Sequence, residues 1–492
     1  MDPKEKIRNL KNNTNIKKIM IFFAITMIFF GMLINRECAT DTYAVFTTGA
    51  KENIIHFLGT GRFVTAIAIV IVRLLRLNEN CIYFLSFAVA CISLIASLYE
   101  LEKIIYKDVK KNVISIILAT LIVLNAFIIE LFLFIEKGIL ITSILFVILA
   151  IKHLIKFFES RDKKEFFKVL VWMFLANGSY QGTVALFIAV ATVYVLKYSK
   201  NIKEFVLNNV VLGVCYAIPA IIDLIIGKIF AGERISGKII LSESIKKVMQ
   251  GTKNMFYSYN MLPKYLFIVC FAIAIGFALF EIIKNKSNIK TKIIQVLSLI
   301  YIILGTLVAT ILPQIMQNTE SIWMVARSTY AFSSLIGITL LYTFINFNVN
   351  KAEYAVVLMS ICYLVIQYKS FTNIEISRYK LNYIDKDETL NILNYIKEYE
   401  NETGNKIENI SVYQDKFVTY TYNDLFVTGD LNVRAYSSDW ATKGILEYYS
   451  GRKFESTEKK KELEEKFEKE NWNAFSKEQL VFENNTLHIC CY

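Results

Sequence analysis

The chain has 492 residues, of which 55% are hydrophobic and 14% aromatic, and its mean hydropathy is +0.42. This composition excludes an ordinary soluble enzyme, because a membrane-spanning helix needs roughly 20 mostly apolar residues and the chain offers about a dozen such segments. The net charge is +12. The cations gather at the ends of the apolar segments, as the positive-inside bias predicts, so this charge does not indicate nucleic-acid binding.

The apolar segments are continuous, and the whole chain has only 4 prolines and 19 glycines. A membrane β-barrel would show alternating segments of roughly ten residues, so the sequence predicts helices. A basic stretch, Lys4 to Lys18, precedes the first segment and places the N-terminus in the cytoplasm. The predicted segments are 19–34, 63–77, 81–98, 113–129, 138–154, a helical hairpin within 166–198, 205–226, 265–283, 293–312, 330–347 and 354–368.

The segments 63–77 and 81–98 conflict with the charge rule. If both crossed the membrane, Lys110 and Lys111 would lie outside. Either one of the two does not cross, or the charge rule fails locally. The first is short for a span, so we favour a partial or re-entrant segment near 63–80. The fold class is therefore an all-α polytopic membrane protein with about 11 transmembrane helices.

The C-terminal region, 372–492, differs in charge. It has 16 Lys and Arg against 22 Asp and Glu, a net charge of −6, so the preceding residues carry +18. We predict two domains, a transmembrane domain at 1–371 and a small extracytoplasmic α+β domain at 372–492. In the second, we expect a helix capped by Asp387 and Gly404. Strands at ISVYQ and KFVTYTY, a hairpin at Asn484-Asn485 and a solvated helix at STEKKKELEEKFEKE complete it.

A polar loop, Asn35 to Arg62, separates the first two apolar segments. It is too polar to cross a bilayer, and with a cytoplasmic N-terminus it lies outside. It carries Glu37 and Asp41 close to the membrane boundary. Asp41 is the best candidate for a catalytic acid or base on that face, with Glu37 beside it. The alternative is that both are solvated loop acids.

Further polar residues stand in or near apolar segments, where each deserves a functional hypothesis. We interpret Glu130 as facing either a water-filled cavity or the lipid headgroups. Asn125 is expected either to contact a ligand or to form a helix–helix hydrogen bond. Tyr180 and Gln181, at a predicted turn, suit a sugar ring, although Tyr180 also suits interfacial anchoring. Arg62 and Arg327 are cations on the outer face. Their guanidinium groups match phosphate oxygens, either of a substrate or of lipid headgroups.

These motifs resemble the GtrII-type bacterial glucosyltransferases, polytopic enzymes related to the C-type glycosyltransferase fold. The resemblance rests on TDTY (Thr40 to Tyr43), GR opening the next segment, NAFIIELFLF, SYQG and the late Arg327. The family loop often holds two consecutive acids, whereas this chain has Thr40-Asp41. The resemblance implies transfer of a sugar, glucose in that family, from a polyprenyl-phosphate donor to a cell-surface glycan outside the bacterial cytoplasmic membrane.

The resemblance thus names the partners as membrane lipid, the polyprenyl-phosphate sugar and a glycan acceptor. In this reading Asp41 deprotonates the acceptor hydroxyl, and Arg62 or Arg327 stabilises the departing phosphate. The sequence requires no cofactor and shows no metal motif, while a divalent metal is compatible with it. The rival functions are a transporter or flippase of lipid-linked sugars, a glycan polymerase or ligase, and a non-catalytic membrane scaffold.

Overall fold

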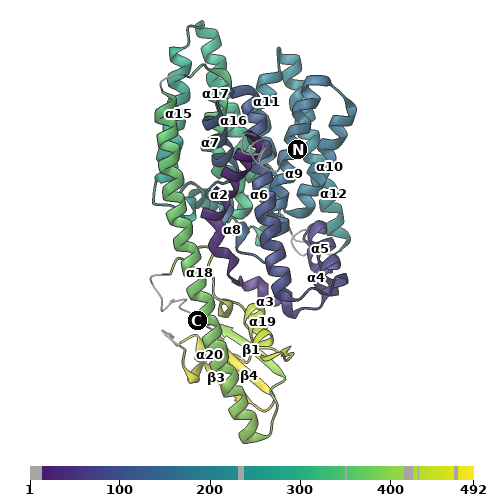
Figure 1. The fold of residues 1–492 in the computed structure, drawn as a ribbon. Helices are drawn as coiled ribbons and strands as arrows, with labels where there is room; N and C mark the ends of the chain where they lie inside the picture. Colours follow the sequence, from purple (N-terminus) through teal and green to yellow (C-terminus); the bar gives the residue numbers. More distant parts are fainter. Residues whose placement is uncertain are drawn as a thin grey trace, which may run out of the picture. The chain divides into compact units, whose positions relative to one another are not determined.

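The computed structural model describes residues 14–230, 238–349, 352–414, 425–429, 431–469 and 475–491 (Figure 1). The chain forms two compact units. The first, here called the helical unit, comprises Met1–Ile34, Ile54–Phe132 and Glu136–Phe371. The second, here called the mixed unit, comprises Asn35–Asn53, Leu133–Ile135 and Thr372–Tyr492. The basic stretch before Thr14 lies largely outside the described residues.

Within the described residues, nine helices are long and apolar enough to cross a membrane. Their apolar character extends to the outer faces: α12, α15 and α16 expose large side chains such as Ile221, Ile273 and Leu304. Extensive apolar patches are rare on proteins that face water, and they are expected where lipid is the solvent. The chain is therefore a multi-pass membrane protein, as predicted, and its described residues hold nine candidate spans where about 11 transmembrane helices were predicted. The nine are α2 with η1 (Thr14–Phe30, Gly31–Ile34), α6 (Glu79–Val109), α9 (Lys137–Ser160), η2 with α11 (Gln181–Thr183, Ala185–Tyr198), α12 (Ile202–Ile229), α15 (Leu266–Lys284), α16 (Ile289–Ile315), η5 with α17 (Arg327–Ser334, Leu335–Asn346) and α18 (Glu353–Thr403).

Two shorter apolar helices accompany them, α5 (Phe63–Leu74) and α7 (Asn112–Val123). A helix of 12 residues is about 18 Å long, whereas the hydrocarbon core is about 30 Å thick. α5 is therefore too short to cross alone, as expected for the first member of the conflicting pair. The predicted turn within 166–198 is present, because α10 (Lys163–Ser179) ends immediately before Tyr180.

The predicted helix 113–129 is wrong, because the helix breaks after Val123 and resumes only at α8 (Ile128–Phe132). Side chains from elsewhere satisfy the carbonyl groups that the break releases. Ser334 Oγ donates to the Ile122 carbonyl at 2.7 Å, Tyr330 donates to Val123, and Gln367 donates to Leu124 at 2.9 Å. Irregular backbone at membrane depth requires such partners, which composition alone cannot foresee.

The stretch between α12 and α15 contains no predicted span. Its described part forms an amphipathic helix, α14 (Leu241–Phe256), and a short 3₁₀ turn, η3 (Ser258–Asn260). The α14 segment is too polar to be recognised as a membrane span. Only the helical periodicity of its apolar residues indicates a helix there.

The mixed unit is built on a four-stranded sheet in the order β2-β1-β4-β3. The strands β1 (Asn409–Gln414), β2 (Glu455–Ser456), β3 (Leu480–Glu483) and β4 (Thr486–Cys491) confirm the predicted ISVYQ strand and the hairpin at Asn484-Asn485. The KFVTYTY strand lies outside the described residues. The helices are α3 (Thr40–Thr47), α19 (Asp439–Ser450) and α20 (Lys461–Phe467), with η6 (Ala435–Ser437) and η7 (Lys477–Gln479).

One long helix, α18, continues from the helical unit into the mixed unit (Figure 1). The predicted N-cap at Asp387 is therefore wrong, because Asp387 lies inside this helix. The predicted end is right: Gly404 has φ +75° and donates its N–H to the Glu400 carbonyl at 3.0 Å. Glycine favours this left-handed conformation at helix ends.

Polar side chains along one face of α18 hold the mixed unit together. Asn382 pairs with the backbone of Cys38, accepting from its N–H at 2.7 Å and donating to its carbonyl at 3.0 Å. The buried Arg434 donates to Asp385 at 2.9 Å and pairs with Glu388. Tyr43 packs in the same apolar core as Ile392 and Tyr436. The polar loop after α2 is therefore part of this unit's core.

Candidate functional site

The helical unit contains a hollow of about 130 Å³ lined by polar and aromatic side chains. The residues come from the start of α5, from η2 and the start of α11, from α12 and α16, and from the segment that leads into η5. They are Arg62, Tyr180, Gln181, Gly182, Ala185, Tyr216, Ala309, Thr310, Pro313, Gln314, Gln317, Ser321, Trp323, Val325, Arg327 and Ser328.

Arg62 carries the hollow's most available charge. It precedes α5, and its guanidinium lies 5.0 Å from the centre of the Tyr180 ring. Its Nη1 is 3.7 Å from Glu136 Oε1, which is an ion pair without a hydrogen bond. No other described residue accepts a hydrogen bond from the guanidinium, and Nε is buried without a partner there. Its fork therefore remains available to a planar anion.

Arg327, at the start of η5, is held by a buried carboxylate. Glu130 is 1% exposed, accepts from the backbone N–H of Arg327 at 2.6 Å and pairs with its guanidinium. A buried carboxylate without such a partner would be very costly. Glu130 therefore positions Arg327, which in turn lines the hollow.

Gln181 lines the hollow with its amide fixed from one side. Its Nε2 donates to the Thr60 carbonyl at 3.1 Å and to Asp223 Oδ2 at 2.8 Å. Both amide hydrogens are thereby used, and no described residue donates to its Oε1. Gln181 thus offers an acceptor for a ligand hydroxyl.

Asp223, from α12, contacts the hollow's Gln181 and is an acid that sequence reasoning left out of the site. It is 5% exposed, and its Oδ1 has no hydrogen-bond partner among the described residues. The backbone approaches it closely at Gly61, where an added Cβ would lie 2.6 Å from Asp223 Oδ2. The sequence did contain a sign of this residue, because an acid inside an apolar segment indicates either a functional site or a buried polar network.

Asn125 is committed to the protein itself. Its Nδ2 donates to Ser334 Oγ at 2.9 Å and to the Tyr330 carbonyl at 3.3 Å, and its Oδ1 accepts from Phe127 N–H at 2.9 Å. It is 1% exposed and does not line the hollow. Its observed role is to stabilise the break between α7 and α8.

Asp41 and Glu37 belong to the mixed unit. Asp41 is half-buried in the first turn of α3, where the helix dipole stabilises a negative charge. It accepts a hydrogen bond from Thr40 Oγ1 at 3.4 Å. Glu37 is buried, and the unit also buries Glu375 and Arg378 of α18. Among the described residues, no three His, Cys, Asp or Glu side chains come together in a way that could hold a metal ion.

The structure thus brings four predicted residues to one hollow: Arg62, Tyr180, Gln181 and Arg327. Glu130 supports it through Arg327. Two guanidinium groups, aromatic rings and amide side chains together can bind a phosphate group next to a sugar ring. Sequence reasoning missed Tyr216 and Gln314, which lie within apolar helices and carry no motif.

Comparisons of the chain with family models, with curated proteins and with solved structures gave no match. The fold and the hollow define a multi-pass membrane protein with a polar site among its helices. The particular activity is accordingly a matter of proposal.

Proposed function

We propose that this chain is a membrane glycosyltransferase that moves a sugar from a polyprenyl-phosphate donor to a glycan acceptor. The observation that carries the proposal is the Arg62 guanidinium, which faces the same hollow as Arg327 and Tyr180 with hydrogen-bond donors left over. A guanidinium group can donate two parallel hydrogen bonds to two oxygens of one phosphate. An aromatic ring such as that of Tyr180 can pack against the face of a sugar ring.

The reaction assigns a task to each group. The acceptor oxygen attacks the anomeric carbon, the bond between that carbon and the phosphate oxygen breaks, and polyprenyl phosphate leaves. Arg62 and Arg327 stabilise the negative charge that develops on the leaving phosphate. A carboxylate takes the acceptor proton. Gln181 Oε1 accepts a hydrogen bond from a sugar hydroxyl.

The base is the part of the proposal with two candidates. Asp41 is the acid that the sequence motif favours. Asp223 is the acid that holds Gln181 at the hollow. Substitution of each by asparagine keeps the shape and removes the base, so Asp41→Asn and Asp223→Asn distinguish them. Loss of a general base lowers the rate by about 10²–10⁴-fold.

The test uses the full chain in vesicles with a radiolabelled polyprenyl-phosphate glucose and extracted surface glycan. We expect label in the glycan with the native protein and a loss of about 10²-fold or more in Arg62→Gln. The proposal fails if Arg62→Gln transfers sugar at the native rate. Movement of the donor across the membrane without any labelled glycan would instead identify a flippase.

A further inference from the structure

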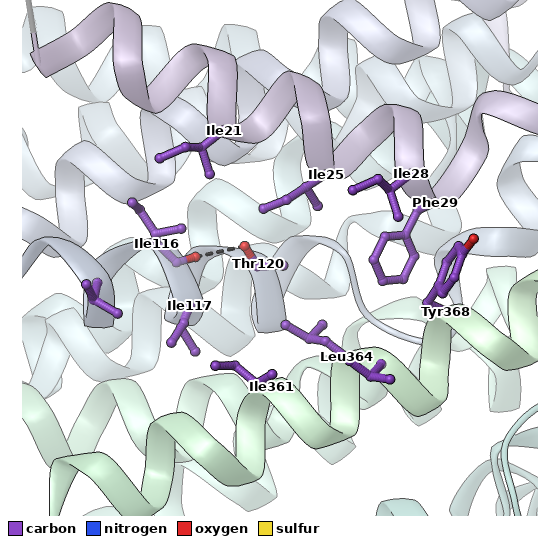
Figure 2. Close-up of a pocket in the computed structure, with 12 residues that line it drawn as sticks. Ile21, Ile25, Ile28, Phe29, Ile116, Ile117, Thr120, Ile361, Leu364 and Tyr368 are labelled. Carbon is purple, nitrogen blue, oxygen red and sulfur yellow. Dashed lines mark hydrogen bonds between the residues drawn. The ribbon is translucent and has the colours of Figure 1, made fainter.

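A second cavity in the helical unit is a groove of about 430 Å³ between three helices (Figure 2). Figure 2 shows side chains of α2 facing those of α18 across the groove, with α7 between them. α2 and α18 are candidate spans, so two walls of the groove belong to helices that are long and apolar enough to cross a membrane. The residues that matter below are Ile21, Ile25 and Phe29 of α2, Ile117 and Thr120 of α7, and Ile361 of α18.

The α7 wall of the groove offers no free hydrogen-bond donor. The one hydroxyl there, Thr120 Oγ1, donates to the Ile116 carbonyl at 2.8 Å, as the dashed line in Figure 2 marks. The remaining α2 and α7 side chains that line the groove are hydrocarbon. A surface of this kind binds a flexible hydrocarbon chain by packing alone.

Ion pairs fix the level at which the three helices meet at one end of the groove. Lys18 pairs with the buried Glu102 at 2.7 Å, and Ser115 of α7 donates to the same carboxylate at 2.6 Å. Lys111, immediately before α7, donates to the Val349 carbonyl at 2.7 Å and pairs with Glu353 at the start of α18. The first turns of α2, α7 and α18 therefore share this level.

Two further exposed lysines stand close in sequence to residues that line the groove. Lys17 is exposed and lies one helical turn before Ile21 on the groove face of α2. Lys110 is exposed and precedes the groove residue Val113 by three positions. Neither makes an ion pair with any residue that the structure describes. An apolar groove thus ends near two ammonium groups that form no ion pair with the residues that the structure describes.

We propose that the groove and these two lysines bind one anionic phospholipid. An acyl chain occupies the groove, and Lys17 and Lys110 bind the headgroup phosphate at the membrane interface. Ammonium groups bind phosphate as point charges and reach the interface on flexible stems. The site uses other helices than the polar hollow, and it does not depend on the proposed transfer activity.

The test is native mass spectrometry of the full chain, with phosphatidylglycerol and phosphatidylcholine as the two probes. The variants are Lys17→Gln with Lys110→Gln, which removes the charges, and Ile25→Trp, which fills the groove. Lys286→Gln with Lys290→Gln is the matched control. It removes two exposed lysines, Lys286 between α15 and α16 and Lys290 in the first turn of α16, that make no ion pair with described residues.

We expect a phosphatidylglycerol adduct that exceeds the phosphatidylcholine adduct in the native chain. Removal of Lys17 and Lys110 weakens it by roughly tenfold or more, because each cation near the interface attracts the anionic headgroup. Ile25→Trp weakens both lipids, and the control variant binds as the native chain does. Equal binding of the two lipids, or an equal loss in the control variant, overturns the proposal. Circular dichroism of each variant separates loss of binding from loss of fold.

Discussion

Arg62 in the helical unit and Arg434 in the mixed unit are both shielded arginines, but they differ in how far their donors are used. Arg434 is 1% exposed, pairs with Asp385 and Glu388, and lies 5.7 Å from the Tyr436 ring centre. Among the described residues, the Arg62 guanidinium has as charged or aromatic partners only Glu136, at 3.7 Å, and the Tyr180 ring. A fully paired buried charge holds structure together, whereas a charge with open donors beside a hollow is prepared for a ligand.

The largest effect is expected for Arg434→Ala. The change leaves Asp385 and Glu388 buried without their cation, which costs about 3–5 kcal/mol. Thermal unfolding in detergent, followed by fluorescence, measures the loss. Arg452→Ala is the control, because Arg452 pairs with Glu400 in a half-exposed position, where a pair contributes about 1 kcal/mol or less. Equal losses in the two variants would contradict the distinction between them.

Arg62→Gln is expected to show the opposite behaviour. The fold is retained, because few native contacts are lost, while binding of polyprenyl phosphate weakens by about 2 kcal/mol, or roughly 30-fold. Arg62→Lys keeps the charge but loses the fork and the stacking on Tyr180, so it should restore only part of the binding. Titration of the purified variants with polyprenyl phosphate measures both. A large loss of stability in Arg62→Gln would contradict this expectation and would indicate that Arg62, like Arg434, has a structural role.

Gly61→Ala tests the close packing beside the hollow. Gly61 has φ +76° and approaches Asp223 and the Gln181 amide, so an alanine there meets both a strained backbone and a clash. Gly404→Ala is a matched control, because Gly404 has φ +75° and nothing within 4 Å of an added Cβ. We expect the strained backbone to lower the free energy of unfolding by about 1–2 kcal/mol in both variants. The clash should lower it by about 1–3 kcal/mol more in Gly61→Ala. If both variants lose the same free energy of unfolding, the expected clash at Gly61 is contradicted.

The smallest effect concerns pH in the mixed unit. Burial lowers the pKa of His488 below its ordinary value of 6.5, although Glu483 opposes this shift. Below that ordinary value the unfolded chain takes up a proton that the folded chain resists. Stability therefore falls as pH drops through about 6.5 towards the lower folded pKa, by at most about 1.4 kcal/mol per pH unit. His488→Gln should flatten the profile of melting temperature against pH between 7 and 5, and an unchanged slope would exclude His488 as its cause.

The sequence by itself determined the features that depend on neighbours along the chain. Long apolar runs gave the candidate spans, because the transfer of each residue into lipid adds along a helix. Gly404 marked the end of α18, and Asn484-Asn485 marked the hairpin, because both rest on local backbone preferences. The residues Arg62, Tyr180, Gln181 and Arg327 were found because polar groups near apolar segments are rare.

Only the tertiary structure decided which of these groups meet and which are used up. Asn125 and Arg62 are both polar residues beside apolar segments, yet Asn125 supports a helix break and Arg62 faces a hollow. The loop with Asp41 contributes to the core of the mixed unit, and α18 runs through Asp387 without a cap. Hydrogen-bond partners from distant segments settle these outcomes, because a buried polar group takes its role from whatever satisfies it.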